Sequence, residues 1–336
     1  MAKILIYAHD PGGANTINPL IEPLKNSGHN LFIYGDGAAL NIFPEVVKFD
    51  GDTDELIKEI QPDFVITGTS AACMTEKKLR KSAKNSGIKS MSILDHWVNY
   101  GIRFTKYSTA ELDLYGKEKI FEYLPDYIVV MDEYAKEQMA NEGISKDIIY
   151  PFGNPHFESV KKDFESINSD DLKKELIGNK EKLVVWASEP YIEDYGHGME
   201  LESLKDVVEL IPENWQLVIK PHPREKADKF DMFKNAKIVR DKNSREVIKA
   251  ADLVMSMTSM FLIESIIAEK PTLSYQKGET DKNKFILTKM NALPFISDKI
   301  ELKNLLNKPF EKPKFEIKFD AKEKIIKFIE EKLCQN

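Results

Sequence analysis

Residues 3–15, KILIYAHDPGGAN, decide the fold because they lead an apolar strand into a helix through a tight polar turn. The run Lys3–Ala8 lacks polar alternation, which is typical of a strand buried on both faces of a parallel sheet. After the glycine turn, Asn18–Lys25 has helical spacing and ends at Gly28. A strand that enters a helix in this way indicates a Rossmann-like α/β unit.

The same alternation of short apolar runs and amphipathic stretches continues along the chain. The predicted strands are Lys3–Ala8, Leu31–Tyr34, Phe64–Thr67, Ser90–Leu94, Tyr127–Met131, Ile148–Pro151, Leu183–Ala187, Gln216–Lys220, Lys237–Val239, Leu253–Met255 and Thr272–Tyr275. The predicted helices between and after them are Asn18–Lys25, Thr53–Glu59, Glu76–Asn85, Lys162–Gly178, Glu202–Leu210, Arg245–Ala250, Ser259–Ala268 and Ala321–Leu333.

Two successive series of this kind predict an α/β protein with two Rossmann-like domains, whose parallel sheets face a central cleft. We expect an acceptor domain at 1–153 and a nucleotide-sugar domain at 154–318, with the seam near Gly153-Asn154-Pro155. The last helix, within 319–336, is expected to pack back on the first domain.

Composition narrows the class of protein further. Of the 336 residues 42% are apolar, which is enough for packed cores, and the net charge is −7. An acidic chain is unlike a nucleic-acid-binding protein, which typically has a basic face. The two cysteines, Cys73 and Cys334, are too far apart in sequence to indicate a disulfide framework or a zinc site. We expect a cytoplasmic protein, since no apolar run approaches the roughly 20 residues of a membrane span.

The first candidate site is the turn that follows the first strand. Gly12 and Gly13 let the backbone approach a ligand closely, and the next helix offers free N–H groups to an anion. We predict that His9 and Asp10 are catalytic and that both glycines bind substrate. The alternative is a tight turn in which Asp10 only caps the helix. The dinucleotide pattern G-x-G-x-x-G is not present.

A second pair of acid and imidazole follows the strand Ser90–Leu94. Asp95 and His96 are predicted to form a general base with its orienting partner, and Asn99 to bind substrate. The alternative is that Asp95 caps a helix and Trp97 belongs to the core. The lysines of Lys77-Lys78 are expected on a solvated helix face.

In the second half, two strands end in polar loops. Ser188 and Glu189 follow one and are predicted to bind substrate, and Lys220-Pro221-His222-Pro223 ends the next. The prolines make the second loop rigid, so Lys220 and His222 are predicted to bind a phosphate. The next strand leads to Ser256, Thr258 and Ser259, whose hydroxyl and N–H groups predict an anion site; ordinary helix capping is the alternative. Glu264 stands in an apolar helix and is predicted to hold a ribose.

These second-half motifs resemble the GT-B superfamily, which contains two-Rossmann glycosyltransferases and the UDP-N-acetylglucosamine 2-epimerases. Lys220-Pro221-His222-Pro223 is similar to the His-Pro motif of GT-B sialyl- and polysialyltransferases and of the glycerophosphotransferases of teichoic acid synthesis. Thr258-Ser259…Glu264…Lys270-Pro271 resembles in spacing the epimerases' Ser-Gly-Gly-x-Gln-Glu-Glu…Gly-Lys-Pro. The resemblance implies phosphate binding by Thr258 and Ser259 and ribose binding by Glu264. Thr258-Ser259 replaces the glycine pair and Ile263 the first Glu, which favours transfer over epimerisation.

Together these observations predict a GT-B glycosyltransferase of surface glycan or glycoconjugate synthesis. It would move a sugar from a UDP- or CMP-linked donor to an acceptor hydroxyl without a metal or other cofactor. Asp10 or Asp95, aided by the neighbouring His, would take the proton of the hydroxyl. The alternatives are a hydrolysing UDP-sugar 2-epimerase, a CDP-glycerol-type glycerophosphotransferase and a non-catalytic nucleotide- or sugar-binding protein. The sequence leaves monomer and homodimer open.

Overall fold

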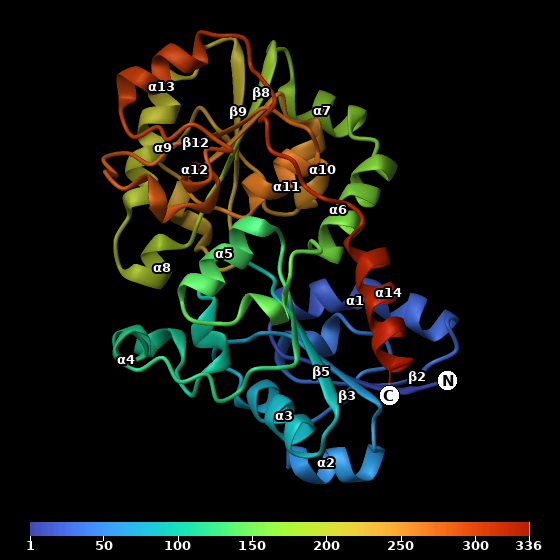
Figure 1. The fold of residues 1–336 in the computed structure, drawn as a ribbon. Helices are drawn as coiled ribbons and strands as arrows, with labels where there is room; N and C mark the ends of the chain where they lie inside the picture. The colour runs from blue at the N-terminus through green and yellow to red at the C-terminus, as the bar shows by residue number, and fades with distance from the viewer. Residues whose placement is uncertain (336) are drawn as a thin grey trace. The chain divides into compact units, whose positions relative to one another are not determined.

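The computed structural model describes residues 1–335, without the side chains of residues 194, 195 and 227. The chain forms two compact units (Figure 1), Met1–Ser159 together with Ile317–Asn336, and Val160–Glu316. Each unit has its own parallel sheet and its own core. The helix α6 (Pro155–Ser166) carries the chain from the first unit to the second. The division of roles between an acceptor domain and a nucleotide-sugar domain stays a prediction.

The first unit is built on seven parallel strands in the order β3-β2-β1-β4-β5-β6-β7. Their bounds are β1 (Lys3–Ala8), β2 (Asn30–Gly35), β3 (Val47–Lys48), β4 (Phe64–Thr67), β5 (Lys89–Ile93), β6 (Tyr127–Val129) and β7 (Ile149–Tyr150). The helices of this unit are α1 (Pro11–Asn26), α2 (Thr53–Ile60), α3 (Met74–Asn85), α4 (Leu112–Lys117), α5 (Glu133–Asn141) and α14 (Ala321–Leu333).

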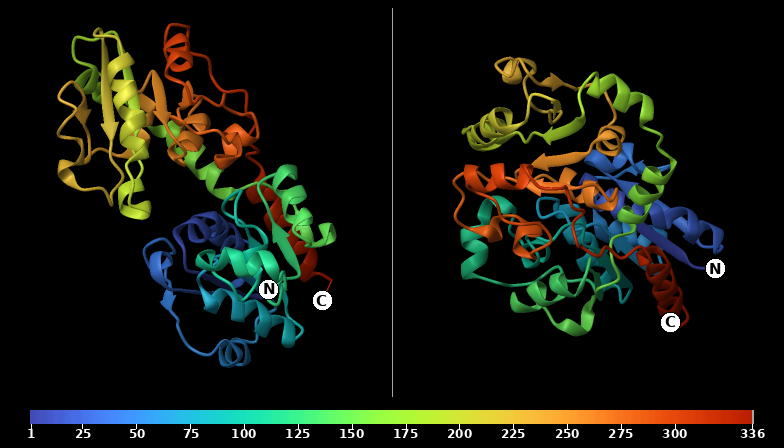
Figure 2. Two further views of the ribbon diagram at one scale, coloured as in Figure 1. Left: turned by 90° about the vertical axis from the view of Figure 1, so that its left-hand side faces the viewer. Right: turned by 90° about the horizontal axis from the view of Figure 1, so that it is seen from above.

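Strand β1 is buried on both sides, as its unbroken apolar sequence requires. Ile4 and Ile6 pack with residues of α1 and α14, whereas Leu5 and Tyr7 pack with residues of α2 and α3. Alternate residues of a strand point to opposite faces, so helices cover both faces of this sheet. The C-terminal helix α14 lies beside α1 (Figures 1 and 2) and adds Ile325 and Ile329 to the same core.

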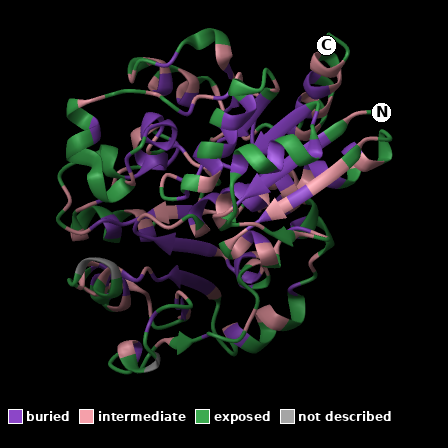
Figure 3. Ribbon diagram, turned by 90° about the horizontal axis from the view of Figure 1, so that it is seen from below, coloured by how far each residue is buried: buried purple, intermediate pink, exposed green. Residues whose placement is uncertain are grey.

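The second unit has five parallel strands in the order β10-β9-β8-β11-β12. Their bounds are β8 (Lys182–Ala187), β9 (Trp215–Lys220), β10 (Lys237–Ile238), β11 (Leu253–Ser256) and β12 (Thr272–Ser274). The helices are α7 (Asp170–Ile177), α8 (Tyr191–Tyr195), α9 (Met199–Leu210), α10 (Ser244–Ala250), α11 (Phe261–Ile267), α12 (Ile286–Lys289) and α13 (Lys299–Leu306). Figure 3 shows that the strands are mostly buried and that exposed residues gather on helices and loops.

Each sheet has one position where the order of strands reverses. In the first unit it lies between β1 and β4, and in the second between β8 and β11. Open α/β sheets bind ligands outside the carboxyl ends of the strands at such a switch point. The residues that follow β1, β4, β8 and β11 are therefore the first place to look for a site.

The structure differs from the sequence-based prediction mainly in its helices. Helix α1 begins at Pro11, seven residues before the predicted start at Asn18, and so includes both glycines. Pro at the first helical position is tolerated, and tertiary packing overrides the low helix propensity of Gly12 and Gly13. The predicted segment Lys162–Gly178 is two helices, α6 and α7.

Within residues 1–335, no helix is long and apolar enough to cross a membrane.

Candidate functional site

At the end of β1, His9 and Asp10 form a side-chain pair. His9 Nδ1 lies 2.7 Å from Asp10 Oδ1, and the two side chains are 35% and 44% exposed. Asp10 holds the N-cap position of α1, but its side chain makes no capping hydrogen bond. An ionised carboxylate only accepts, so in the neutral ring Nδ1 carries the proton and Nε2 is the acceptor. That arrangement gives the imidazole the geometry of a general base with an orienting acid.

The two glycines of the turn are required by packing. A Cβ added at Gly12 would lie 1.8 Å from Asp95 Oδ2, and one at Gly13 would lie 3.2 Å from the Cα of Gly68. The start of α1 therefore sits directly against the carboxyl ends of β4 and β5. This closeness accounts for both glycines, and their predicted contact with substrate stays a prediction.

Asp95 pairs with a residue that the sequence analysis did not single out. Its Oδ1 accepts a hydrogen bond of 2.7 Å from Arg103 Nη1, and the same nitrogen donates to the Thr69 carbonyl and hydroxyl. Arg103 Nε donates to the carbonyl of Asn99, whose φ of 56° is left-handed. The Asp95 side chain thus forms an ion pair with Arg103, and its predicted role as a general base with His96 stays a prediction.

His96 and Trp97 lie beside this ion pair. The His96 ring is largely enclosed, its Nδ1 is buried without a hydrogen-bond partner, and burial lowers its pKa. The imidazole is therefore neutral near pH 7. Trp97 is 4% exposed, stacks on Phe157 and donates through Nε1 to Asp132. Trp97 is a core residue, as the alternative interpretation of the sequence held.

Helix α3 holds buried charges that sequence reasoning missed. Glu76, Lys77 and Arg80 are each fully buried, so the expectation that Lys77 lies on a solvated face is wrong. Lys77 Nζ donates to the carbonyls of Ala71 and Tyr107, each at 2.6 Å, and burial lowers its pKa to about 8. The only hint in the sequence is the polar stretch after β4, whose N–H and carbonyl groups need buried partners.

At the switch point of the second unit, Glu189 joins the ends of β8 and β11. Its Oε1 accepts from the Thr258 N–H at 2.7 Å and from the Ser256 hydroxyl at 3.0 Å, and its Oε2 accepts from the Thr258 hydroxyl at 2.5 Å. Burial raises the pKa of this carboxyl, although the hydrogen bonds from Thr258 and Ser256 oppose the shift. The donors that the sequence assigns to a phosphate thus hold a carboxylate of the chain itself.

On the other side of β8, Glu225 holds the loop that contains His222. Its Oε2 accepts from the His222 N–H at 2.6 Å, and its Oε1 accepts from the Ser188 hydroxyl at 2.8 Å. His222 Nδ1 in turn accepts from the Arg224 N–H at 3.2 Å. The neutral ring therefore carries its proton on Nε2.

Lys220 is 8% exposed, and its ammonium group donates to the carbonyls of Arg240 and Lys242 at 3.0 and 2.6 Å. Burial lowers its pKa. These bonds tie the end of β9 to the segment after β10. They give Lys220 a structural task, and its predicted contact with a phosphate stays a prediction.

Ser259 and Glu264 belong to the start of α11. The Ser259 hydroxyl accepts from the Phe261 N–H at 3.2 Å, while the N-cap residue of α11 is Met260 and no side chain caps the helix. Glu264 Oε2 lies 3.5 Å from Arg245 Nε, and burial raises the pKa of its carboxyl. Ribose binding by Glu264 stays a prediction.

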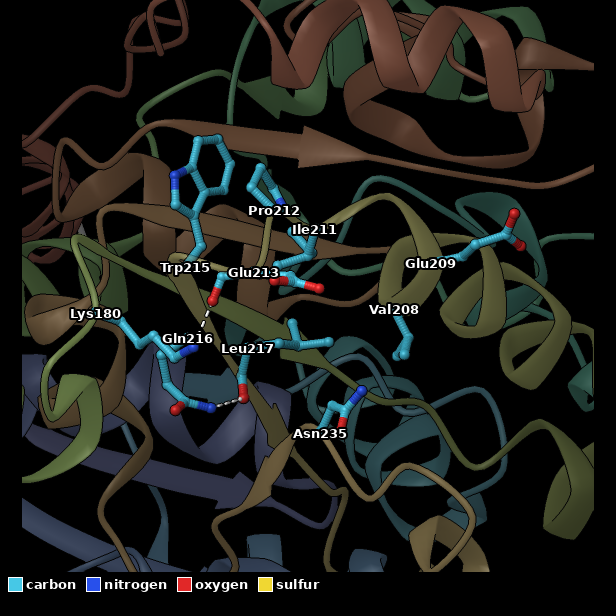
Figure 4. Close-up of a pocket in the computed structure, with 10 residues that line it drawn as sticks. All are labelled: Lys180, Val208, Glu209, Ile211, Pro212, Glu213, Trp215, Gln216, Leu217 and Asn235. Carbon is cyan, nitrogen blue, oxygen red and sulfur yellow. Dashed lines mark hydrogen bonds between the residues drawn. The ribbon is translucent and has the colours of Figure 1, made fainter.

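Two pockets of the second unit lie at opposite ends of its strands. A pocket of about 420 Å³ adjoins the Glu189 corner and is lined by Tyr191, His197, Met257, Thr258 and Gln276 among others. The pocket in Figure 4, about 620 Å³, surrounds Trp215, Gln216 and Leu217 at the amino end of β9. It is therefore remote from the switch point. Among the residues whose side chains the structure describes, no cluster of three His, Cys, Asp or Glu is arranged to hold a metal ion.

The sequence matches no protein-family model. It also matches no curated protein. Solved structures, in contrast, resemble the chain along its whole length. The UDP-GlcNAc 2-epimerase of Methanocaldococcus jannaschii has a TM-score of 0.69 and 16% identity, over 98% of this chain and 99% of that one.

Two further structures have similar scores. The UDP-GlcNAc 2-epimerase of Neisseria meningitidis, solved with UDP-GlcNAc, has a TM-score of 0.66 and 14% identity over 98% of this chain and 100% of that one. A glycotransferase of kitacinnamycin has a TM-score of 0.64 and 13% identity over 99% of both chains. At such low sequence identity, the structural similarity supports the fold alone. The chain has the GT-B type of fold, with two Rossmann-like parallel sheets, as its sequence predicts.

Proposed function

We propose that the protein is a glycosyltransferase that uses a nucleotide sugar. The observation that carries the proposal is the corner between β8 and β11, where one N–H and two hydroxyl groups already hold a carboxylate, that of Glu189. N–H and O–H groups that donate to a carboxylate can also donate to phosphate oxygens. The fold, shared with enzymes named for UDP-GlcNAc and with a glycotransferase, adds support.

In this proposal the phosphate of the donor replaces the Glu189 carboxylate at Thr258. His222, whose Nδ1 accepts a hydrogen bond from the Arg224 N–H, is proposed to contact the same phosphate. Strands β9 and β11 both flank β8, so the loops that carry the two groups leave the same edge of the sheet from strands that are about 10 Å apart. Fixed donors of this kind stabilise the charge that develops on a departing phosphate.

The acceptor is proposed to bind at the His9–Asp10 pair. His9 Nε2 takes the proton of the acceptor hydroxyl while its oxygen forms a bond to the anomeric carbon. The bond from that carbon to the donor phosphate breaks, and the nucleotide leaves with the electron pair. Asp10 orients the ring and stabilises its cationic form. Asp95 is the weaker candidate for the base, because its carboxylate is paired with Arg103.

The test is turnover by Asp10→Asn with a nucleotide-sugar donor and a panel of glycan acceptors. Loss of the orienting carboxylate should reduce kcat by about 10²–10⁴-fold, the usual contribution of general acid–base catalysis, with donor binding nearly intact. Asp113→Asn, at an exposed position of α4, is the matched control. Full turnover by Asp10→Asn would remove the His9–Asp10 pair from the mechanism.

The structural neighbours favour a second candidate, a UDP-sugar 2-epimerase. Incubation of UDP-GlcNAc without any acceptor separates the two reactions. An epimerised sugar detected by NMR would identify the epimerase. Release of nucleotide only when an acceptor is added would identify the transferase.

A further inference from the structure

Glu76 is a buried acid at the switch point of the first unit that the proposed reaction does not use. Its Oε1 accepts from the His9 N–H at 2.9 Å, and its Oε2 accepts from the Ser70 N–H at 2.6 Å. His9 follows β1 and Ser70 follows β4, so a single carboxylate bridges the ends of the two central strands.

The space around this carboxylate is filled by the chain. A Cβ added at Gly68 would lie 2.7 Å from Glu76 Oε1, so the residue after β4 leaves room only for a glycine. Arg80, one helical turn along α3, donates to the Thr67 hydroxyl and to the carbonyls of Gly68, Tyr123 and Arg103. Glu76 thus accepts hydrogen bonds from two backbone N–H groups, those of His9 and Ser70.

We propose that Glu76 is a positioning residue for the His9–Asp10 pair, and that its protonation loosens the His9 backbone and so links the geometry of the pair to pH. An ionised carboxylate accepts at both oxygens, and each N–H bond to it is charge-assisted. Protonation converts one oxygen into a donor and weakens the hold on His9 or Ser70. The inference rests on the proposed function only for the chemical role of the His9–Asp10 pair.

The titration of Glu76 falls in the range where this link matters. Burial raises the pKa of its carboxyl to about 7, opposed by Arg80 and by the N–H bonds from Ser70 and His9. The ionisable groups that face it from the surrounding elements are Arg80 and Lys77 on α3, Asp10 after β1, and Tyr7 and Cys73. Below pH 7 the carboxyl gains its proton, and the bridge between β1 and β4 weakens.

The direct test follows the backbone N–H signals of His9 and Ser70 by NMR from pH 5 to 9. Both should titrate with one shared midpoint near 7 in the unmodified protein. Ser70 is the decisive reporter, since its N–H bonds to Glu76 and is not part of the His9–Asp10 pair. In Glu76→Gln the shared midpoint should disappear, while Glu22→Gln, exposed on α1, should retain it.

The outcomes separate this inference from the proposed function. Different midpoints for the two N–H signals, or no midpoint near 7, would overturn the inference in the unmodified protein, even if Glu76→Gln fails to fold. If glycosyl transfer is found, Glu76→Gln should flatten the fall of kcat below pH 7 and leave the KM of the donor unchanged. An unchanged kcat profile would also overturn it. If the His9 and Ser70 signals share a midpoint but no glycosyl transfer is found, only the proposed function is overturned.

Discussion

Glu189 occupies the hydrogen-bond donors that the sequence analysis assigned to a phosphate. The sequence analysis placed it among substrate-binding residues, and the structure gives it the Thr258 N–H and the hydroxyls of Ser256 and Thr258. An anionic ligand in that corner must displace a carboxylate, which repels it as well. We therefore propose that Glu189 sets the affinity of the corner for phosphate.

Glu189→Gln should tighten binding of the preferred nucleoside diphosphate by about tenfold. The Glu189 carboxylate competes with the ligand for the same donors, and each charge-assisted hydrogen bond that it loses is worth about 1.5–3 kcal/mol. Burial raises the pKa of Glu189, so the unmodified protein should bind more tightly as the pH falls and the carboxyl gains its proton. The ratio of its Kd to that of the variant should shrink toward one. Titration calorimetry at several pH values checks this, with Glu202→Gln, exposed on α9, as control. Weaker binding by Glu189→Gln would show that the carboxylate holds the corner in shape for the ligand.

Single residues also show where sequence reasoning reaches its limit. His9 and Asp10 are neighbours in the chain, so their pairing was within reach of a sequence-based interpretation. Asp95 pairs with Arg103, and the His222 loop depends on Glu225; neither partner was recognised in the sequence. Hydrogen bonds between separate loops depend on tertiary structure, which local patterns do not encode.

At the scale of elements, the start of α1 packs closely against the ends of β4 and β5. Asp95 cannot easily move away from Gly12, because Arg103 holds its other oxygen at 2.7 Å. A methyl group at residue 12 would therefore force α1 away from β5 or break the ion pair.

Gly12→Ala should lower the free energy of unfolding by about 1–3 kcal/mol, the usual cost of overpacking. Gly116→Ala in α4 is the control, since a Cβ there meets nothing within 4 Å and alanine favours a helix. Urea unfolding followed by circular dichroism measures both variants. If Gly12→Ala is as stable as the unmodified protein, the Asp95–Arg103 pair can shift to make room for the methyl group at little cost.

Strands were easier to predict than helices, for a physical reason. The run Phe64–Thr67 matches β4 to the residue, because all four of its residues are buried and none is charged. Helix α3 was expected to be solvated on its charged side, yet it buries Glu76, Lys77 and Arg80. Buried charges that find backbone partners look the same in a sequence as exposed ones.

For the whole molecule, the reversal of strand order gives both units a similar arrangement. A carboxylate bridges the switch point in each: Glu76 holds the loops after β1 and β4, and Glu189 holds those of β8 and β11. Two successive series of strands and helices predicted the two sheets, and the solved GT-B structures bear out that fold. The chemistry at each edge depends on side-chain contacts and therefore needs direct measurement.

The central claim is that the carboxyl edge of the second sheet holds the phosphate of a leaving nucleotide. Thermal unfolding with CMP, CDP, UDP, GDP and dTDP tests it most directly, because a ligand at 100 times its Kd stabilises the native state by about 2.7 kcal/mol. We predict that at least one nucleotide raises the Tm, and that Thr258→Val and His222→Gln each reduce the rise while Thr109→Val, exposed in the first unit, does not. No rise with any nucleotide, or an equal rise in all three variants, would contradict the claim.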